Sequence, residues 1–147
     1  MDNGGTDWLS AFDPIQTLTS SSRDGYIRSM YDEVADLYHL VYKDWGAAIE
    51  QQAAALDQVI TGLIGRPPHS LLDVSCGIGT QFLGLAARNY KVTASDLSAG
   101  SVARARREAR DRGVAIDFSV ADMRDCADGQ LGAFDVVLSA DNSIPHL

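Results

Sequence analysis

Two glycines, Gly77 and Gly79, stand where a short apolar segment gives way to a helical pattern. Glycine in such a strand-to-helix turn permits unusual backbone dihedral angles and lets the main chain approach a ligand closely. Asp73 precedes Gly77 by four residues and can hold the turn by accepting hydrogen bonds from backbone N–H groups. The spacing indicates a cofactor-binding loop, but it does not by itself choose between a nicotinamide dinucleotide and another nucleoside cofactor.

Carboxylates follow the second and third strands that the pattern predicts. Asp96 comes seventeen residues after Gly79, and a short acid on a rigid strand end can accept two hydrogen bonds from a ribose diol. Asp122 can accept from an exocyclic amine while Met123 packs on an adenine face. Either aspartate alone is more often a solvated strand-end or turn residue. Together with the glycine loop, at one edge of a sheet, they favour a nucleoside site.

Phe82 separates the two classes of cofactor. Dinucleotide-binding dehydrogenases carry the pattern G-x-G-x-x-G, whose third glycine serves a close contact between helix and strand. Counted from Gly77, that position is Phe82, and Gly84 is out of register. Because a large aromatic side chain opposes such a contact, the residues disfavour a nicotinamide cofactor.

A parallel sheet is needed to bring these side chains together. Apolar or alternating runs predict strands over residues about 69–74, 91–95, 115–120 and 134–140. Helical patterns are expected from Thr80 to Asn89 and from a cap at Ser98 to Arg112, closed by Gly113. Strands alternating with helices predict an α/β, Rossmann-like fold with right-handed crossovers.

Two further helices are expected ahead of the sheet. Apolar residues recur at helical spacing over residues 26–42 and again over 47–64. We therefore divide the chain into three parts. Residues 1–24 form a flexible segment or a flap that closes over a ligand, residues 25–65 a helical lid, and residues 66–147 the Rossmann-like domain.

The fourth strand has consequences for the sheet. If the first strand is central, as the glycine loop implies, the apolar fourth strand becomes an edge. Long apolar edges are rarely left bare in native proteins. We therefore expect a sheet truncated at its C-terminal side, with further strands and most of the acceptor site beyond Leu147.

Composition narrows the class of ligand. The 147 residues carry a formal net charge of −8, whereas nucleic acids and anionic membranes need basic faces. We therefore expect no nucleic acid and no membrane partner, but a small neutral or zwitterionic molecule; a homo-oligomer is compatible with the composition. Cys76 and Cys126 are too few for a disulfide framework or a zinc site, and no histidine pair has metal-ligand spacing. A cytoplasmic protein without a metal is expected.

Two conspicuous features have simple interpretations. Five arginines are interspersed with acids along one predicted helix, which indicates a solvated face with i,i+4 ion pairs: Arg104, Arg106, Arg107, Arg110 and Arg112. Cys76 lies at a helix N-terminus, which lowers thiol pKa values, but it has no neighbouring His or Lys in sequence. We do not expect covalent catalysis from it.

Residues 73–80 resemble motif I of the class I S-adenosylmethionine-dependent methyltransferases. Asp96 matches that family's ribose-binding acid, and residues 121–123 match its adenine-contacting motif. The resemblance covers about residues 26–147 and implies the family's fold, S-adenosylmethionine as cofactor, and methyl transfer. It implies cofactor contacts from Asp73, Ser75, Cys76, Gly77, Gly79, Asp96, Leu97, Ala121, Asp122 and Met123.

A narrower resemblance lies at residues 141–147, which are similar to the N-S-x-x-H-L segment of glycine and glycine/sarcosine N-methyltransferases. It implies that Asn142 faces the acceptor, that His146 contacts the cofactor, and that the Ala140 carbonyl receives the cofactor's ammonium group. The segment from Tyr31 to Tyr38 resembles the lid helix of these enzymes, with Tyr38 at an aromatic cofactor-contacting position.

One departure from the subfamily concerns the carboxylate of the cofactor. These enzymes usually carry an arginine near the start of the second helix, where this sequence has Gly46-Ala47-Ala48. Either another group performs that task, with Arg23 and Arg28 as candidates, or the subfamily is a different one.

The expected reaction is methyl transfer to a small-molecule amine, such as glycine or sarcosine, by direct in-line displacement. The protein must then align the nucleophile, exclude water and favour the deprotonated amine. Asn142 would orient the acceptor, His146 would support the cofactor or take a proton through a water, and Tyr31 would contact the sulfonium-bound methyl. Two alternatives remain open: a methyltransferase for another small molecule (a carboxylate, hydroxyl or arsenical), and a non-catalytic S-adenosylmethionine-binding module.

Overall fold

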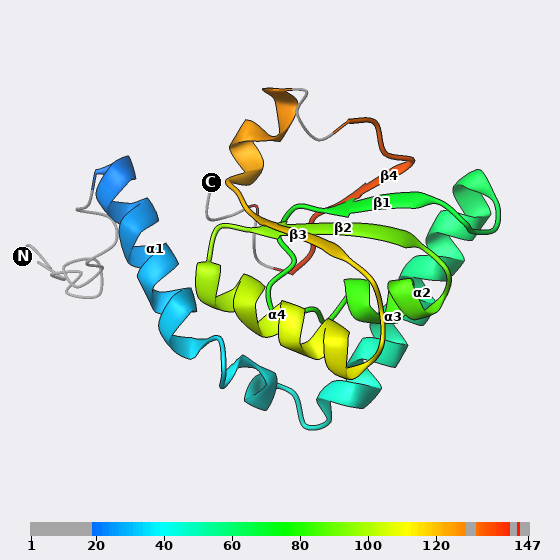
Figure 1. The fold of residues 1–147 in the computed structure, drawn as a ribbon, viewed down its shortest axis with the longest axis horizontal. Helices are drawn as coiled ribbons and strands as arrows, with labels where there is room; N and C mark the ends of the chain where they lie inside the picture. Colours follow the sequence, from blue (N-terminus) through cyan, green and yellow to red (C-terminus); the bar gives the residue numbers. More distant parts are fainter. Residues whose placement is uncertain (1–18, 129–131, 142–143, 145–147) are drawn as a thin grey trace, which may run out of the picture.

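The computed structural model of the protein describes residues 19–128, 132–141 and 144. Four parallel strands form one sheet (Figure 1): β1 (Ser70–Asp73), β2 (Lys91–Asp96), β3 (Asp117–Val120) and β4 (Val136–Leu138). Their order is β3-β2-β1-β4, so the predicted central position of the first strand and edge position of the fourth are confirmed. Because the strands are parallel, their carboxyl ends meet at one edge of the sheet.

Three helices cover one face of this sheet (Figure 1): α2 (Trp45–Ile64), α3 (Phe82–Ala87) and α4 (Ala99–Asp111). Helix α4 begins as predicted, because the Ser98 hydroxyl oxygen accepts from the Ser101 N–H at 3.0 Å. The apolar side chains between these helices and the sheet form the core, which includes Ile49, Leu71, Phe82, Leu83, Leu85, Val92, Ala94, Val102 and Ala105. None of the described helices is both long and apolar enough to cross a membrane.

Helices α2 and α3 meet closely at Gly84. A Cβ atom at this position would lie 2.4 Å from the Cβ of Ala53 and 2.9 Å from the backbone oxygen of Ile49. Such distances are far shorter than van der Waals contact, so only glycine fits without a shift of a helix. The glycine that is out of register for a dinucleotide fingerprint therefore serves helix packing.

The N-terminal helix differs from the prediction. Helix α1 spans Ser20–Val34, and a short 3₁₀ helix, η2 (Tyr38–Val41), follows after a turn. The prediction of one continuous helix over residues 26–42 was wrong. The carbonyl oxygen of Asp36 accepts from the Arg104 guanidinium at 2.8 Å, and the Leu40 N–H donates to Leu37 instead. In a continuous helix the Leu40 N–H would donate to the Asp36 carbonyl, but here that carbonyl binds a side chain from α4. Helix α1 itself packs against α4 (Figure 1).

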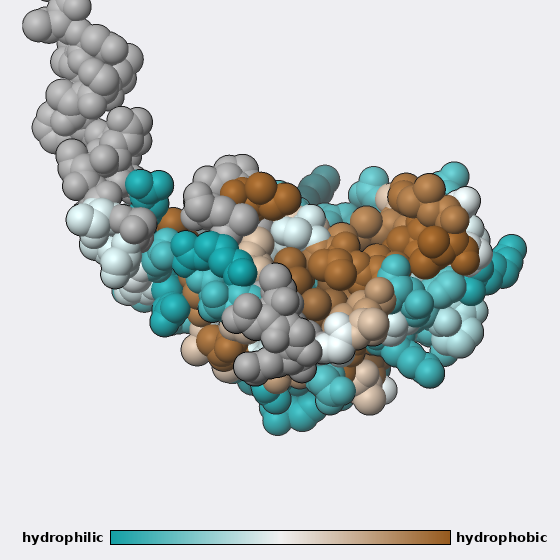
Figure 2. Space-filling view, turned by 90° about the horizontal axis from the view of Figure 1, so that it is seen from above, coloured by the Kyte–Doolittle hydropathy of each residue, from teal (hydrophilic) through white to brown (hydrophobic). Residues whose placement is uncertain are grey.

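The opposite face of the sheet is apolar. Val136 and Leu138 pack on the core, so Val137 between them points to this other face, where it is 65% exposed. Figure 2 looks onto this side and shows apolar residues gathered across its middle. The predicted apolar edge strand therefore presents an apolar side chain to the surface among the residues that the structure describes.

Candidate functional site

The glycine loop joins β1 to α3 at the carboxyl edge of the sheet and is held from two sides. Gly77 has a φ of +49°, and its N–H donates to the Asp96 carboxylate at 2.8 Å. The Cys76 N–H donates to the Ser95 carbonyl at 2.9 Å, which ties the loop to the end of β2. Asp73 accepts from the Ser75 N–H at 3.2 Å, which confirms its predicted role in holding the turn.

Asp96 connects two loops through one carboxylate. Its second oxygen accepts from the Ser98 N–H at 2.9 Å, at the start of α4. Burial raises the pKa of Asp96, and the hydrogen bonds from Ser98 and Gly77 oppose that increase. This strand-end acid is therefore fixed in position and points to the same pocket as the glycine loop.

Asp122 lies after β3 and shares an arginine with helix α1. Arg124, in the 3₁₀ helix η3 (Met123–Asp128), donates from Nε to Asp122 at 2.9 Å and from Nη2 to Asp24 at 2.7 Å. Hydrogen bonds from Arg124 hold the pKa of Asp122 below its ordinary value, and the charge of Arg28 lowers it further. The same arginine therefore ties the beginning of α1 to the carboxyl edge of the sheet.

One pocket at this edge gathers most of the residues that the sequence singled out. Ten of them line it: Tyr31, Tyr38, Ser75, Cys76, Gly77, Asp96, Leu97, Asp122, Met123 and Ala140. Three others do not. Asp73 is fully buried, Gly79 packs against Leu83 and Phe82, and the Ala121 N–H donates to the Asp96 carbonyl at 3.0 Å. The remaining two, Asn142 and His146, lie outside the described residues.

Helix α1 contributes a stripe of pocket residues, of which the sequence analysis named Arg28 and Tyr31 but missed Asp24 and Ile27. Asp24, Ile27 and Arg28 line the pocket beside Tyr31, at the i, i+3, i+4 and i+7 spacing of one helix face. Because this face mixes charged and apolar side chains, the search for an apolar stripe overlooked it. Of the two arginine candidates, Arg28 lines the pocket and Arg23 does not.

Two tyrosines face each other across part of the pocket. The ring centroids of Tyr31 and Tyr38 are 6.3 Å apart, with the planes tilted by 52°. Burial raises the pKa of both phenols, and the negative charges of Asp96 and Asp141 raise them further. Neutral aromatic rings beside carboxylates are a suitable surround for a positively charged ligand group.

Cys76 lines the pocket as a neutral thiol. Burial raises its pKa well above the ordinary value, and the charges of Asp73 and Asp96 add to the increase. A thiol that resists ionisation is a poor nucleophile. This agrees with the expectation that the cysteine performs no covalent chemistry.

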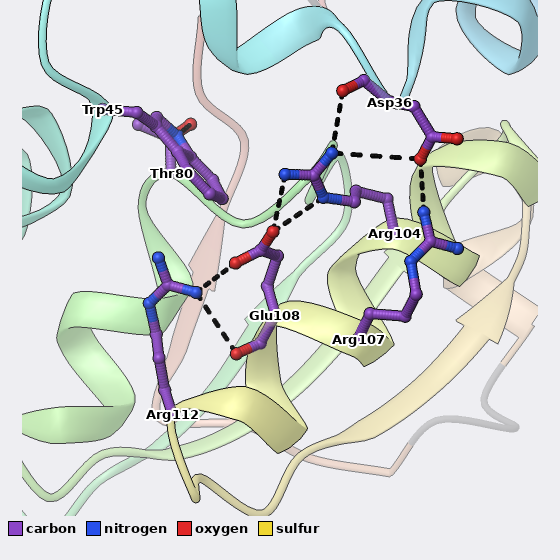
Figure 3. Close-up of polar contacts among 7 residues, drawn as sticks. All are labelled: Asp36, Trp45, Thr80, Arg104, Arg107, Glu108 and Arg112. Carbon is purple, nitrogen blue, oxygen red and sulfur yellow. Dashed lines mark hydrogen bonds and ion pairs between the residues drawn. The ribbon is translucent and has the colours of Figure 1, made fainter.

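Trp45 supports the glycine loop from the start of α2 (Figure 3). Its indole N–H donates to the hydroxyl oxygen of Thr80 at 2.9 Å. The guanidinium carbons of Arg104 and Arg112 lie 5.8 Å and 5.1 Å from the centre of the indole ring. Because Thr80 lines the pocket, this tryptophan connects the pocket wall to α4.

The basic run on α4 is more than a solvated face. Its predicted i,i+4 pairs are confirmed, because Glu108 bridges Arg104 and Arg112 (Figure 3). However, the side chain of Arg104 is only 16% exposed and binds the Asp36 carbonyl, and Arg107 pairs with the Asp36 carboxylate. The predicted solvated face is confirmed for Arg106, Arg107, Arg110 and Arg112, which are exposed, while Arg104 is partly buried. Arg104 and Arg107 also anchor the turn between α1 and η2.

A parallel sheet with a glycine loop and strand-end acids around one pocket defines a Rossmann-like nucleoside-cofactor domain. The methyltransferase domain family matches residues 71–147, which is more than half of the chain. The chain therefore belongs to this family, within the class I S-adenosylmethionine-dependent methyltransferases.

Individual relatives differ in what they act on. A glycine/sarcosine N-methyltransferase of Parasynechococcus marenigrum (strain WH8102) is 32% identical over 145 residues, which cover 91% of this chain and 50% of that protein. The 23S rRNA (uracil(1939)-C(5))-methyltransferase RlmD of Methylococcus capsulatus is 42% identical over 69 residues, 46% of this chain and 16% of that protein. The chain thus spans half, or less, of the length of these relatives.

A solved structure supports the fold. The magnesium protoporphyrin IX methyltransferase (ChlM) from Synechocystis PCC 6803 with bound S-adenosylmethionine has a TM-score of 0.67. The two chains are 21% identical, and the match covers 89% of this chain and 65% of the other. The predicted Rossmann-like class I methyltransferase fold is therefore confirmed.

Proposed function

We propose that the protein binds S-adenosylmethionine in this pocket and transfers its methyl group to a small-molecule amine. The main support is that Asp96 and Asp122, from neighbouring strand ends, line the same pocket as the glycine loop. Asp96 would accept from the ribose hydroxyls and Asp122 from the adenine amine, with Met123 against the adenine face. The Asp122 carboxylate already bonds Arg124, so the adenine amine would share or displace that partner.

The amino-acid half of the cofactor would lie at the other end of the pocket, near Ala140. Arg28 lines the pocket, but its charge acts on Asp122, at the proposed adenine end, and on Asp32, which binds the Ser98 hydroxyl at the start of α4. Thr80 and Tyr38, whose hydroxyl groups can donate, also line the pocket. Neutral donors would therefore replace the arginine that the related enzymes carry.

When bound, S-adenosylmethionine supplies an activated methyl group: the acceptor nitrogen bonds to that carbon as the carbon–sulfur bond breaks and its electron pair returns to sulfur. The residues of this chain would align the acceptor, exclude water and bind the positively charged sulfonium group. Tyr31 and Tyr38 suit the last task, because their neutral rings lie beside carboxylates. Helix α1 would cover the pocket, and Asn142 and His146 would orient the acceptor and accept its proton.

The acceptor is proposed from charge and from similarity. A net charge of −8 opposes RNA, although one relative is an rRNA methyltransferase by name. An amine acceptor is consistent with the name of the glycine/sarcosine relative. Glycine and sarcosine are therefore the first acceptors to assay.

Isothermal titration with S-adenosylhomocysteine tests the cofactor site. We expect binding, and we expect Asp96→Ala to weaken it strongly. No binding at millimolar ligand, or an Asp96→Ala variant that binds as well as the wild type, would refute the site. Methyl transfer to glycine, sarcosine and dimethylglycine then tests the acceptor. Binding without transfer to any of them would refute the amino-acid acceptor but leave the cofactor site intact.

A further inference from the structure

Asp141 is a pocket residue that none of the cofactor assignments uses. It directly follows Ala140 at the end of β4 and lines the pocket. Its φ is +59°, a left-handed conformation that aspartate and asparagine tolerate better than other non-glycine residues. The backbone therefore turns at Asp141 and places a carboxylate at the carboxyl edge of the sheet.

Gln81 holds this carboxylate in one orientation. Gln81 occupies the N-cap position of α3, yet its side chain makes no capping hydrogen bond. Its amide nitrogen instead donates to Asp141 Oδ2 at 3.0 Å and to Gln52 Oε1, on α2, at 2.8 Å. Only 5% of Gln81 is exposed, and both hydrogens of its amide are used. The second oxygen of Asp141 takes no hydrogen bond from a described residue.

At Asp141 the pocket carries a negative charge that no cationic side chain among the described residues pairs with. Among the described residues, no ion pair includes Asp141. Of the two arginines that line the pocket, Arg124 binds Asp24 and Asp122, and the charge of Arg28 acts on Asp32 and Asp122. Tyr31 and Tyr38 supply the nearby aromatic surface. An oriented carboxylate beside aromatic rings is suited to bind a protonated amine.

We propose that Asp141 binds a protonated amino group of the ligand and that Gln81 is the residue that positions it. The inference rests on the proposed function and refines it. A protonated amine has two sources here, the amino-acid half of the cofactor and the acceptor. A carboxylate beside the acceptor nitrogen would hold it as ammonium, which has no lone pair for attack. The cofactor's ammonium group is therefore the expected partner.

Asp141→Asn is a sharp test because it removes the charge and little else. Asparagine also tolerates the left-handed backbone and keeps an oxygen for Gln81. The probes are S-adenosylhomocysteine, which has the ammonium group, and 5′-methylthioadenosine, which lacks the amino-acid half. We expect Asp141→Asn to weaken S-adenosylhomocysteine about 10-fold, the effect of losing one charge-assisted hydrogen bond, and to leave 5′-methylthioadenosine unchanged. Asp111→Asn, at the exposed end of α4, is the matched control.

A double-mutant cycle tests the positioning role of Gln81. Gln81→Leu alone should weaken S-adenosylhomocysteine, but it should add little in the Asp141→Asn background, because the amide then has no charge to orient. Fully additive effects would show that Gln81 acts independently and would overturn its positioning role.

The outcomes separate the two sources. Unchanged S-adenosylhomocysteine binding with weakened sarcosine binding to the S-adenosylhomocysteine complex would assign Asp141 to the acceptor amine. The inference would be overturned if Asp141→Asn lost the same affinity for both nucleosides, or if it lost affinity for none of the ligands. A wild-type protein that binds neither nucleoside would refute the proposed function itself, and the inference with it.

Discussion

The Asp96 carboxylate and the Gly77 N–H are joined by a hydrogen bond of 2.8 Å, so the acid that we propose as the ribose contact also holds the glycine loop. Its other oxygen holds the Ser98 N–H at 2.9 Å, at the start of α4. One side chain thus sets the relative positions of two loops and of the pocket between them. The shape of the pocket and its chemistry depend on the same carboxylate.

The substitution Asp96→Asn should therefore lower both the stability of the protein and its affinity for the ligand. Asparagine offers one acceptor oxygen, and its NH₂ group would face an N–H donor. We expect a loss of stability of about 1–3 kcal/mol, typical of a buried donor left without a partner, and at least about 10-fold weaker S-adenosylhomocysteine binding. Urea unfolding and titration calorimetry measure the two effects. Asp117→Asn, at the exposed start of β3, is the control, and equal behaviour of the two variants would contradict the dual role.

Trp45 and Thr80 should be energetically coupled. Trp45→Phe keeps a ring near Arg104 and Arg112 but removes the indole N–H that donates to Thr80, a residue only 3% exposed. A cycle of Trp45→Phe, Thr80→Val and the double variant should give a coupling energy of about 1 kcal/mol, the net value of one such hydrogen bond. Urea unfolding measures it. A coupling energy near zero would show that the ring contacts alone position the tryptophan.

Local patterns were sufficient to predict the sheet, and distant contacts were not predictable. The central position of the first strand and the edge position of the fourth followed from apolar runs and the glycine loop. Asp96 and Asp122 were found because each lies at or just beyond the end of a strand. The end of α1 was missed because the turn that follows it is held by a bond from Arg104 to the Asp36 carbonyl, which joins residues 68 positions apart. Gln81 was missed for a similar reason, since its partners Gln52 and Asp141 come from distant segments.

Substitution by alanine should have opposite effects on stability at Gly84 and at Gly62. A Cβ at Gly84 would meet Ala53 and the backbone of Ile49, whereas a Cβ at Gly62 would meet nothing within 4 Å. We expect Gly84→Ala to destabilise the protein by about 1–3 kcal/mol through overpacking between α2 and α3. Gly62→Ala, within α2, should stabilise it by about 0.5–1 kcal/mol. Thermal and urea unfolding measure both, and a neutral Gly84→Ala would show that the two helices separate easily.

Asp73 should make stability fall as pH rises. It is fully buried, and one of its carboxylate oxygens takes no hydrogen bond from the described part of the chain. Burial raises its pKa to about 7, whereas an aspartate in the unfolded chain titrates near about 4. The folded state therefore binds the proton more tightly. Proton binding by Asp73 therefore contributes fully to the free energy of unfolding below about pH 4. This contribution declines as the pH rises and levels off above the folded-state pKa of about 7.

Comparison with Asp73→Asn isolates this effect from other titrating groups. Asparagine can still accept from the Ser75 N–H but does not ionise. The free energy of unfolding of the wild type minus that of the variant should fall by up to about 1.4 kcal/mol per pH unit between about pH 4 and pH 7. Urea unfolding at several pH values measures the difference, and parallel curves would contradict the raised pKa.

Asp135 provides a control of opposite sign. The backbone N–H and hydroxyl of Ser70 donate to its carboxylate at 2.7 Å and 2.8 Å, and they hold its pKa below the ordinary value. This stabilising contribution is present above the unfolded-state pKa and is lost as pH falls through the folded-state value. The difference between the wild type and Asp135→Asn should therefore rise with pH in the acid range and stay level from pH 5 to 7, where the Asp73→Asn difference falls. Asp73 is buried without a full set of hydrogen-bond partners, whereas Asp135 is exposed and accepts from two donors. If the two stability differences change with pH in opposite directions, the pKa shift of each acid is explained by its own surroundings.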